Sequence, residues 1–411
     1  DWTPNFSTEF RVNYKEFSRA QNCLAGDTIG AFDIQLRPSD LVGTPLEGIL
    51  SDPQGDDERI NFAGGCDRFR QGNTFDDERL QLFGAGNYVW GDHFITFGAD
   101  LQQYELDNFF AQRSVGGFRY RGFDDLNTQT ANRVQVQLPA SGNRDDTRVV
   151  WGYDQLALFA QDQWQITPDF RLDYGLRYEN YISFDTPPTR AFHDALFPQS
   201  PSNTDLEGTD ILMPRVGFEY TPFDRTRITG GFGLFAGGDP VVWTSNAFVS
   251  TLLIEDFGVP NTNPSLGTPQ VILDQILSAT SGPIDVIDPD FEIPSDWRAS
   301  LKVDQEFDLN FEEYGINLGE DYLVSFQVIA SQVNNGFLWR NLAHTDRADT
   351  APLGVAPDGR PIYADLETLG FNNHVQLTNY DDGESLIYSI ALSKQYENGL
   401  GFFASYANQD I

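Results

Sequence analysis

No run of apolar residues in this sequence is long enough to cross a membrane as a helix. A spanning helix needs about 18 or more apolar residues in succession, and the 411-residue chain has a mean hydropathy of −0.38. Aromatic residues nevertheless make up 14% of the chain. A transmembrane β-barrel reconciles these two facts, because only every second residue of its strands must be apolar and its loops can be polar. The composition therefore argues against a helical membrane protein and permits a barrel.

Positive charge is scarce as well: 26 Lys and Arg stand against 61 Asp and Glu, for a formal net charge of −35. Nucleic-acid binding requires a basic surface, so we expect no nucleic acid as a partner. The acidic balance is compatible with divalent cations, and Ca²⁺ prefers carboxylate oxygens. Two acidic loop segments supply candidate calcium ligands, namely Asp56, Asp57, Glu58, Asp288 and Asp290. Neither segment matches the twelve-residue EF-hand loop, so we favour solvated loops and expect no cofactor.

Cysteine and histidine are also rare. The four histidines (His93, His193, His344 and His374) have no metal-ligand spacing, and GxSxG, P-loop and CxxC motifs are absent. We therefore expect no catalytic residue and no enzyme. The two cysteines, Cys23 and Cys66, lie in one long polar segment. An oxidising exterior would permit a disulfide between them, and two unpaired thiols are the alternative.

The sequence does contain long stretches in which apolar and polar residues alternate. After a turn at Pro168-Asp169, the apolar residues Phe170, Leu172, Tyr174, Leu176 and Tyr178 alternate with Arg171, Asp173, Gly175, Arg177 and Glu179. A period of two places these sets on opposite faces of one strand. We expect the apolar set to face lipid and the charged set to face a wet lumen. The same pattern assigns Arg11, Arg215, Glu219, Arg298 and Lys302 to the lumen, where interleaved signs favour cross-strand pairing.

Eleven strands are predicted from this alternation, near residues 2–16, 76–90, 93–108, 152–166, 170–184, 212–223, 227–238, 296–308, 321–335, 384–396 and 400–411. Tight turns alternate with five long segments, 17–75, 109–151, 185–211, 239–295 and 336–383. Short turns on one rim and long loops on the other are typical of outer-membrane barrels. Trp90 and Trp164 near short turns, with Trp151 and Trp297 at the opposite strand ends, suggest aromatic girdles. We therefore expect an all-β, antiparallel up-and-down transmembrane barrel.

One long segment also carries a helix signal. Within 239–295, Thr268-Pro269 is followed by spaced aliphatic residues, which predicts a short amphipathic helix.

Residues 157–179 (ALFAQDQWQITPDFRLDYGLRYE) resemble a hallmark of TonB-dependent outer-membrane receptors. In that family a strand with a QD.W pattern turns tightly into a strand that ends GLRYE. The matching positions here are Gln161, Asp162, Trp164, Gly175, Leu176, Arg177, Tyr178 and Glu179. Residues 213–233 resemble the following hairpin, and the stretch from Asp67 to Phe110 is similar to the Oar-like branch of these receptors.

The resemblance implies a barrel of about 22 strands, plugged by an N-terminal domain and driven by periplasmic TonB, that moves a large solute across the outer membrane. With eleven strands visible, residues 1–411 are expected to form part of one transmembrane barrel domain, with the plug, the N-terminal domain and the other strands outside this chain. The partners would be outer-membrane lipid, the TonB complex and an unknown large substrate or surface protein, with the long loops extracellular. A passive porin and a structural or adhesive barrel with acidic loops are the alternatives.

Overall fold

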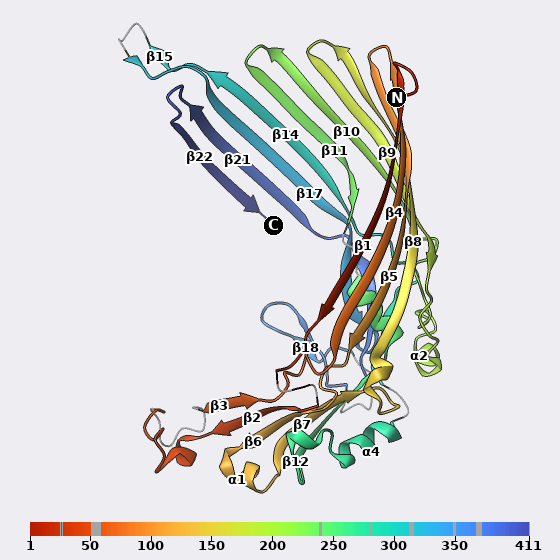
Figure 1. The fold of residues 1–411 in the computed structure, drawn as a ribbon, viewed down its shortest axis with the longest axis vertical. Helices are drawn as coiled ribbons and strands as arrows, with labels where there is room; N and C mark the ends of the chain where they lie inside the picture. The colour runs from red at the N-terminus through yellow and green to blue at the C-terminus, as the bar shows by residue number, and fades with distance from the viewer. Residues whose placement is uncertain are drawn as a thin grey trace.

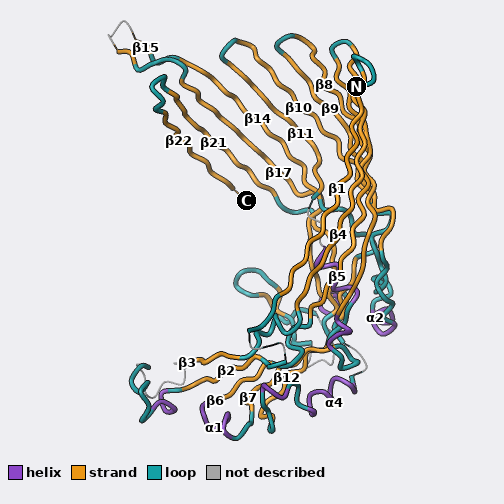
Figure 2. The backbone as a smooth tube through the Cα atoms, viewed as in Figure 1, coloured by secondary structure: helices purple, strands orange, loops and turns teal. Residues whose placement is uncertain are grey.

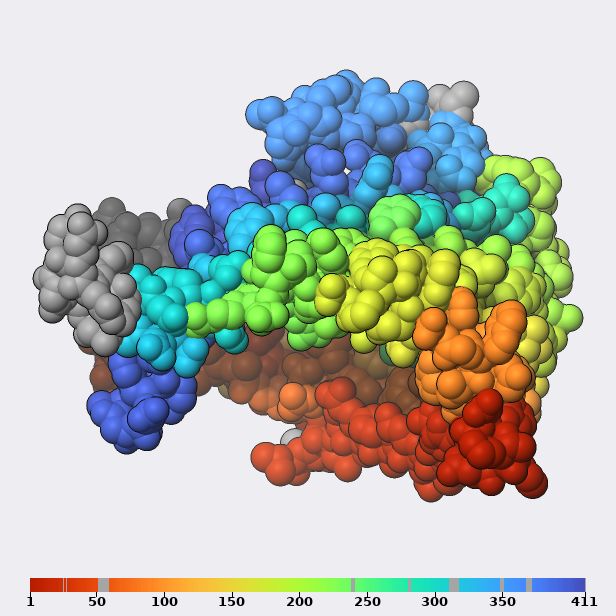
Figure 3. Space-filling model, turned by 90° about the horizontal axis from the view of Figure 1, so that it is seen from above, coloured from red at the N-terminus to blue at the C-terminus, as the bar shows by residue number. Residues whose placement is uncertain are grey.

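The computed structural model describes residues 1–410 apart from 25, 27, 51–58, 238–240, 280–281, 312–315, 348–350 and 367–371. One large sheet dominates the molecule; a five-stranded sheet and the short helices gather at one end of it, and a small two-stranded sheet lies at the other (Figures 1 and 2). Seen from the end with the short turns, the strands of the large sheet follow one another along a curved band (Figure 3).

Eleven strands form what we call the wall, and all eleven were predicted from the alternation. They are β1 (Phe6–Ala20), β4 (Asn73–Trp90), β5 (His93–Phe110), β8 (Arg148–Thr167), β9 (Phe170–Phe184), β10 (Asp210–Phe223), β11 (Thr226–Ala236), β14 (Ser295–Phe307), β17 (Tyr322–Asn341), β21 (Glu384–Gln395) and β22 (Gly401–Asp410). Each wall strand pairs antiparallel with the next along the chain. Gly91 has a φ of +59° in the two-residue turn between β4 and β5, where a residue without a Cβ is favoured.

The first wall strand begins later than predicted. The backbone N–H groups of Trp2 and Thr3 both donate to the carbonyl of Phe6, which folds the first residues into a turn. At its other end β1 continues to Ala20, which lies opposite Thr74 in β4. Pairing between the strands therefore extends beyond the part that the alternation marks.

Two further strands of the large sheet lie in segments that the sequence assigned to loops. The C-terminal part of β17 pairs with β20 (His374–Tyr380), and β20 pairs in parallel with β13 (Ile284–Ile287). The N-terminal part of β17 pairs with β21. Because β17 changes partner along its length, it runs to Asn341, six residues beyond its predicted end.

A second sheet of five strands lies on the long-loop side. Its order is β12 (Leu252–Val259), β7 (Ala131–Leu138), β6 (Gly117–Arg121), β2 (Ala31–Leu36) and β3 (Ile60–Gly64), with β2 and β6 parallel. One face packs on α4 (Gln270–Ser278) through the buried Ile272 and Ile276. This helix is the one predicted after Thr268-Pro269, and its buried stripe completes a core that the sheet alone would leave exposed.

The remaining elements are short. They are η1 (Pro38–Leu41), α1 (Gly122–Asn127), η2 (Arg144–Thr147), α2 (Ala191–Leu196), α3 (Val241–Phe248), η3 (Pro264–Leu266), α5 (Leu342–Thr345) and the hairpins β15 (Asn310–Phe311) with β16 (Ile316–Asn317) and β18 (Gly354–Val355) with β19 (Pro361–Ile362). Within the described ranges, no helix has the length and apolarity that a membrane crossing demands. Over the same residues the large sheet does not close, since β1 and β22 each pair on one side only (Figure 1).

Candidate functional site

The two faces of the wall differ in chemistry. Strand pairing places Leu176 opposite Ala160 in β8 and Pro214 in β10, and successive residues of a strand point to opposite faces. We call the face of Leu176 the apolar face and the other the charged face. The apolar face carries Phe170, Leu172, Tyr174, Leu176 and Tyr178, and the charged face carries Arg11, Arg171, Asp173, Arg177, Glu179, Arg215, Glu219, Arg298 and Lys302. The structure thus brings each predicted set together on one face.

Ion pairs cover the charged face, but most of them run along strands rather than across them. Arg177 Nε lies 2.6 Å from Glu179 Oε1, and Lys302 Nζ lies 2.7 Å from Asp304 Oδ2. Glu219 instead pairs across strands: it accepts a hydrogen bond from Arg227 at 2.8 Å, and Arg171 lies 3.4 Å from it as an ion pair. The predicted cross-strand pattern is therefore largely wrong, because residues two apart on one face are already within reach. Such partly exposed pairs contribute about 0–1 kcal/mol each.

Arg215 differs from its neighbours on this face. Across the described parts of the chain no carboxylate oxygen lies within 4.0 Å of its guanidinium, which instead stacks 4.4 Å from the centre of the Phe235 ring. Its Nε donates to the carbonyl of Leu234 at 3.4 Å. An arginine held over an aromatic ring keeps its donors available for a further acceptor.

The apolar face contains an ionisable cluster near the short turns, which the sequence motif did not explain. Asp162 Oδ2 lies 2.6 Å from His93 Nδ1 and accepts from the Tyr174 hydroxyl at 2.8 Å. The rings of Trp90 and Trp164 stack on either side of His93. The QD.W motif therefore supplies a carboxylate that ties β5, β8 and β9 together, and a tryptophan that shields it from its surroundings.

At the long-loop end, an aromatic cluster fills the charged face. Trp151 is 1% exposed, stacks on Phe248 of α3 with 5.7 Å between ring centres, and donates from Nε1 to Ser245 Oγ at 2.8 Å. Tyr153 packs beside it, opposite Tyr104 in the neighbouring strand. The assignment of Trp151 to an outer girdle is wrong, because its strand position points it to the face that α3 covers. No local sequence signal marks this contact, since α3 lies about 90 residues further along the chain.

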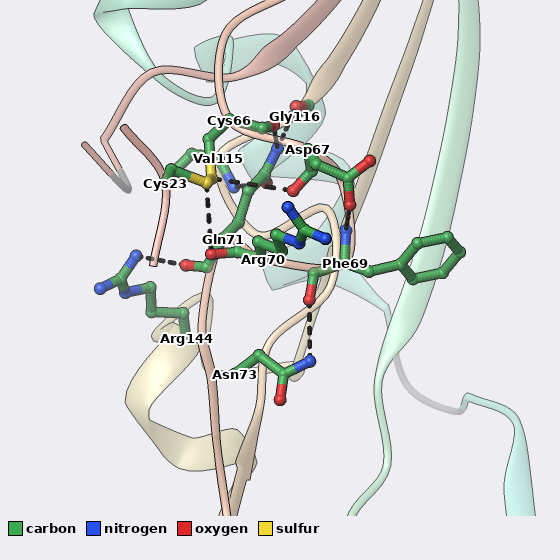
Figure 4. The surroundings of a disulfide bond; sticks show 10 residues. All are labelled: Cys23, Cys66, Asp67, Phe69, Arg70, Gln71, Asn73, Val115, Gly116 and Arg144. Atoms are coloured by element: carbon green, nitrogen blue, oxygen red, sulfur yellow. Dashed lines mark hydrogen bonds between the residues drawn. A yellow bond between two sulfur atoms is a disulfide. The ribbon is translucent and has the colours of Figure 1, made fainter. Parts of the chain in front are cut away.

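Cys23 and Cys66 form the predicted disulfide, with 5.3 Å between their Cα atoms (Figure 4). The bond joins the segment after β1 to the segment before β4. The buried Gln71 reinforces the junction, because its amide donates to the carbonyls of Cys66 and Gly116 and accepts from the N–H of Val115. The five-stranded sheet is thereby fastened to the long-loop end of the wall by covalent and buried polar contacts.

The calcium candidates fall into two groups. Asp56, Asp57 and Glu58 lie outside the described residues. Asp288 accepts from the Thr378 hydroxyl at 2.6 Å and from the backbone N–H of Asp290 at 3.1 Å, which is a loop-capping arrangement. Among the residues that the structure places, no group of three or more His, Cys, Asp and Glu side chains is arranged to hold a metal ion.

Two histidines meet in the long-loop region. His193 of α2 and His374 of β20 are buried, with 2.8 Å between their Nδ1 atoms. His193 Nε2 donates to the carbonyl of Ser200, so its Nδ1 accepts from His374 when both rings are neutral. Burial lowers the pKa of His193, and burial next to His193 lowers the pKa of His374 to about 4. A charge on either buried ring is costly, so the pair joins the two long loops most stably while both rings are neutral.

Acid should therefore loosen this junction. The folded protein holds the His374 pKa near 4, below the ordinary value of 6.5, so the stabilisation is complete above pH 6.5 and declines as pH falls towards 4. In thermal melts between pH 7.5 and 4.5, we expect His374→Gln to lose less stability than the unsubstituted protein, because glutamine can still donate to His193 but takes up no proton in this pH range. His344→Gln, outside the pair, is the control and should keep the full pH dependence. Identical slopes for all three proteins would contradict this role.

The family described as Outer membrane beta barrel domain matches residues 2–407. Solved structures with a similar fold include a variant of the ferric enterobactin receptor PfeA from Pseudomonas aeruginosa (12% identity, TM-score 0.46, 99% of this chain and 41% of that chain). The outer membrane transporter YddB from Escherichia coli is another (10% identity, TM-score 0.45, 99% of this chain and 46% of that chain). A third is the FrpB iron transporter from Neisseria meningitidis (9% identity, TM-score 0.38, 82% of this chain and 37% of that chain). The chain therefore spans less than half the length of each of these three proteins. No curated protein sequence matches it.

Proposed function

Because this chain belongs to the outer membrane beta barrel domain family, we propose that it forms part of the barrel of a TonB-dependent receptor that moves a large solute across the outer membrane. The β8–β9 hairpin carries this proposal. It contains Gln161, Asp162 and Trp164 followed by the GLRYE stretch at 175–179, which is the order of motifs in such receptors. The hairpin lies in the middle of the wall. In this role the apolar face contacts lipid and the charged face lines the lumen.

The orientation follows from the cost of the alternative. Turning the wall inside out would expose the charged face to hydrocarbon, and a single Arg at the midplane costs about 2–4 kcal/mol. The long loops then lie outside the cell, as in other outer-membrane barrels. Recognition of the solute would fall to these loops and to the charged face, where Arg215 keeps donors free for an acceptor.

Further strands of the same polypeptide would pair with β1 and β22. Each of these strands offers one row of backbone N–H and C=O groups without a partner among the described residues. Such groups are costly in hydrocarbon, where water cannot satisfy them. We propose that the rest of the barrel, a plug and an N-terminal domain belong to the same protein, and that periplasmic TonB drives it.

Two measurements on the full-length gene product test this function. In planar bilayers, a plugged receptor should conduct little until mild denaturant loosens the plug, and the purified periplasmic domain of TonB should bind to it. Immediate open-channel conductance without TonB binding would favour a passive porin. A closed barrel that neither binds TonB nor opens in denaturant would favour a structural or adhesive barrel.

A further inference from the structure

A cavity of about 340 Å³ opens on the long-loop side of the molecule. Its lining comes from α3 and from the small strands β13 and β20 beside the end of β17. Two tryptophans, Trp243 and Trp339, line it together with Asp285 and Asn246, and the other lining residues are aliphatic. A cavity of this size holds a small organic group, and its polar atoms are concentrated at one point.

The two indole rings form one side of the cavity. Trp243 of α3 and Trp339 of β17 have ring centres 4.7 Å apart with planes at 46°. They are 53% and 40% exposed, although they touch each other. Strand pairing places Trp339 opposite Leu377 and Asp285 opposite Val375, so Trp339 and Asp285 share one face of this small sheet. An accessible pair of aromatic faces therefore lies next to a carboxylate.

The electrostatics of Asp285 are unusual for this acidic chain. Burial raises the pKa of its carboxyl to about 6, and the Asn246 amide is its hydrogen-bond partner. Within the part of the chain that the structure describes, no Lys, Arg or His nitrogen lies within 4.0 Å of it. A largely buried carboxylate without a counter-ion is costly, because the protein removes most of its water and supplies no opposite charge. A ligand that carries a positive charge would supply the counter-ion that Asp285 does not find among the described residues.

We propose that this cavity binds an organic ammonium group, with Asp285 as its counter-ion and the rings of Trp243 and Trp339 as an aromatic wall. Ammonium groups bind to the faces of aromatic rings, most strongly to indole, and the carboxylate neutralises their charge. A carbohydrate fits this cavity less well, because the aliphatic lining would leave most of its hydroxyls without hydrogen-bond partners. The site stands on these contacts and does not depend on the proposed transport function.

Asp285 alone should control the pH dependence of binding. The α3 helix carries no titratable residue, and β13 carries only Asp285. His374 and Arg340 are on strands next to the cavity but alternate with the residues that face it, so they point to the other side of the small sheet. With a pKa of about 6, Asp285 is ionised at pH 8 and only about one-tenth ionised at pH 5.

The test titrates choline into the purified full-length protein in detergent micelles, by calorimetry and by tryptophan fluorescence. We expect saturable binding that weakens about tenfold from pH 8 to pH 5, in line with the ionised fraction of Asp285. The neutral isostere 3,3-dimethyl-1-butanol, which has the same shape without the charge, should bind at least about tenfold more weakly, as should methyl glucoside. Equal binding of the isostere, or no saturable binding of choline, would overturn the proposal.

Variants locate the site. Asp285→Asn should weaken choline binding about tenfold or more without lowering the thermal midpoint, because it removes an unpaired buried charge. Trp243→Leu changes a half-exposed ring on another element and should also weaken choline binding. It keeps the proposal testable if Asp285→Asn fails to fold. Asp290→Asn, in the same loop but outside the cavity, is the matched control and should bind like the unsubstituted protein. Unchanged affinity in Asp285→Asn would refute the assignment.

Discussion

Leu301→Arg is expected to destabilise the folded barrel by about 2–4 kcal/mol, which is the cost of an arginine at the midplane of the bilayer. Leu301 lies in the middle of β14 on the apolar face, opposite Gly230 and Val328. In the proposed orientation its side chain contacts lipid tails. The measurement is equilibrium unfolding of the full-length protein in lipid vesicles, followed by tryptophan fluorescence and by the heat-dependent shift of the folded band on gels.

Ser300→Arg is the control for this prediction. It introduces the same side chain one residue away, on the charged face, where Lys302 and Arg298 already lie. An arginine there remains in water, so we expect a change of stability within about 0.5 kcal/mol. A larger loss of stability for Ser300→Arg than for Leu301→Arg would mean that the charged face, not the apolar face, contacts lipid. The proposed orientation of the barrel would then be wrong.

Trp151→Ala should release α3 from the wall and cost about 3–5 kcal/mol, as large aromatic-to-alanine changes in a packed core do. The substitution removes the stacking on Phe248 and leaves Ser245 without the indole donor. We expect a lower thermal midpoint and faster cleavage by proteases around residues 241–248. Phe257→Ala removes a ring that is 63% exposed in β12 and should change neither. Equal cleavage of the two variants would mean that α3 does not depend on this contact.

The wall was predictable because its signal is local. In β9, the side chains from Phe170 to Glu179 alternate between apolar and polar, so the polarity of each position indicates which face of the strand it occupies. The α4 helix was predictable for the same reason, because its buried Ile272 and Ile276 repeat at helical spacing. The disulfide needed only two cysteines and an oxidising compartment.

The loop architecture was not predictable from these signals. β13 has four residues, too few to establish a period of two, and it acquires its place by pairing with β20 about 90 residues later. β2 pairs in parallel with β6 across about 85 residues of chain. His193 and His374 are 181 residues apart, and each looks like an isolated polar residue in the sequence. Such short elements are stabilised by contacts with residues far away in the sequence, so no local pattern predicts them.

The sequence by itself therefore determined the eleven wall strands, the two faces of the wall and the contrast between short turns and long loops. These features depend on whether each strand residue faces an apolar or a polar environment, and the polarity of that residue's own side chain indicates which. The tertiary structure alone decided that Trp151 turns inward under α3, that Asp162 is sheltered by His93 and Tyr174, and that Asp285 faces two tryptophans across a cavity. Each of these contacts joins segments far apart in the chain, and only the folded chain specifies which distant groups come within reach.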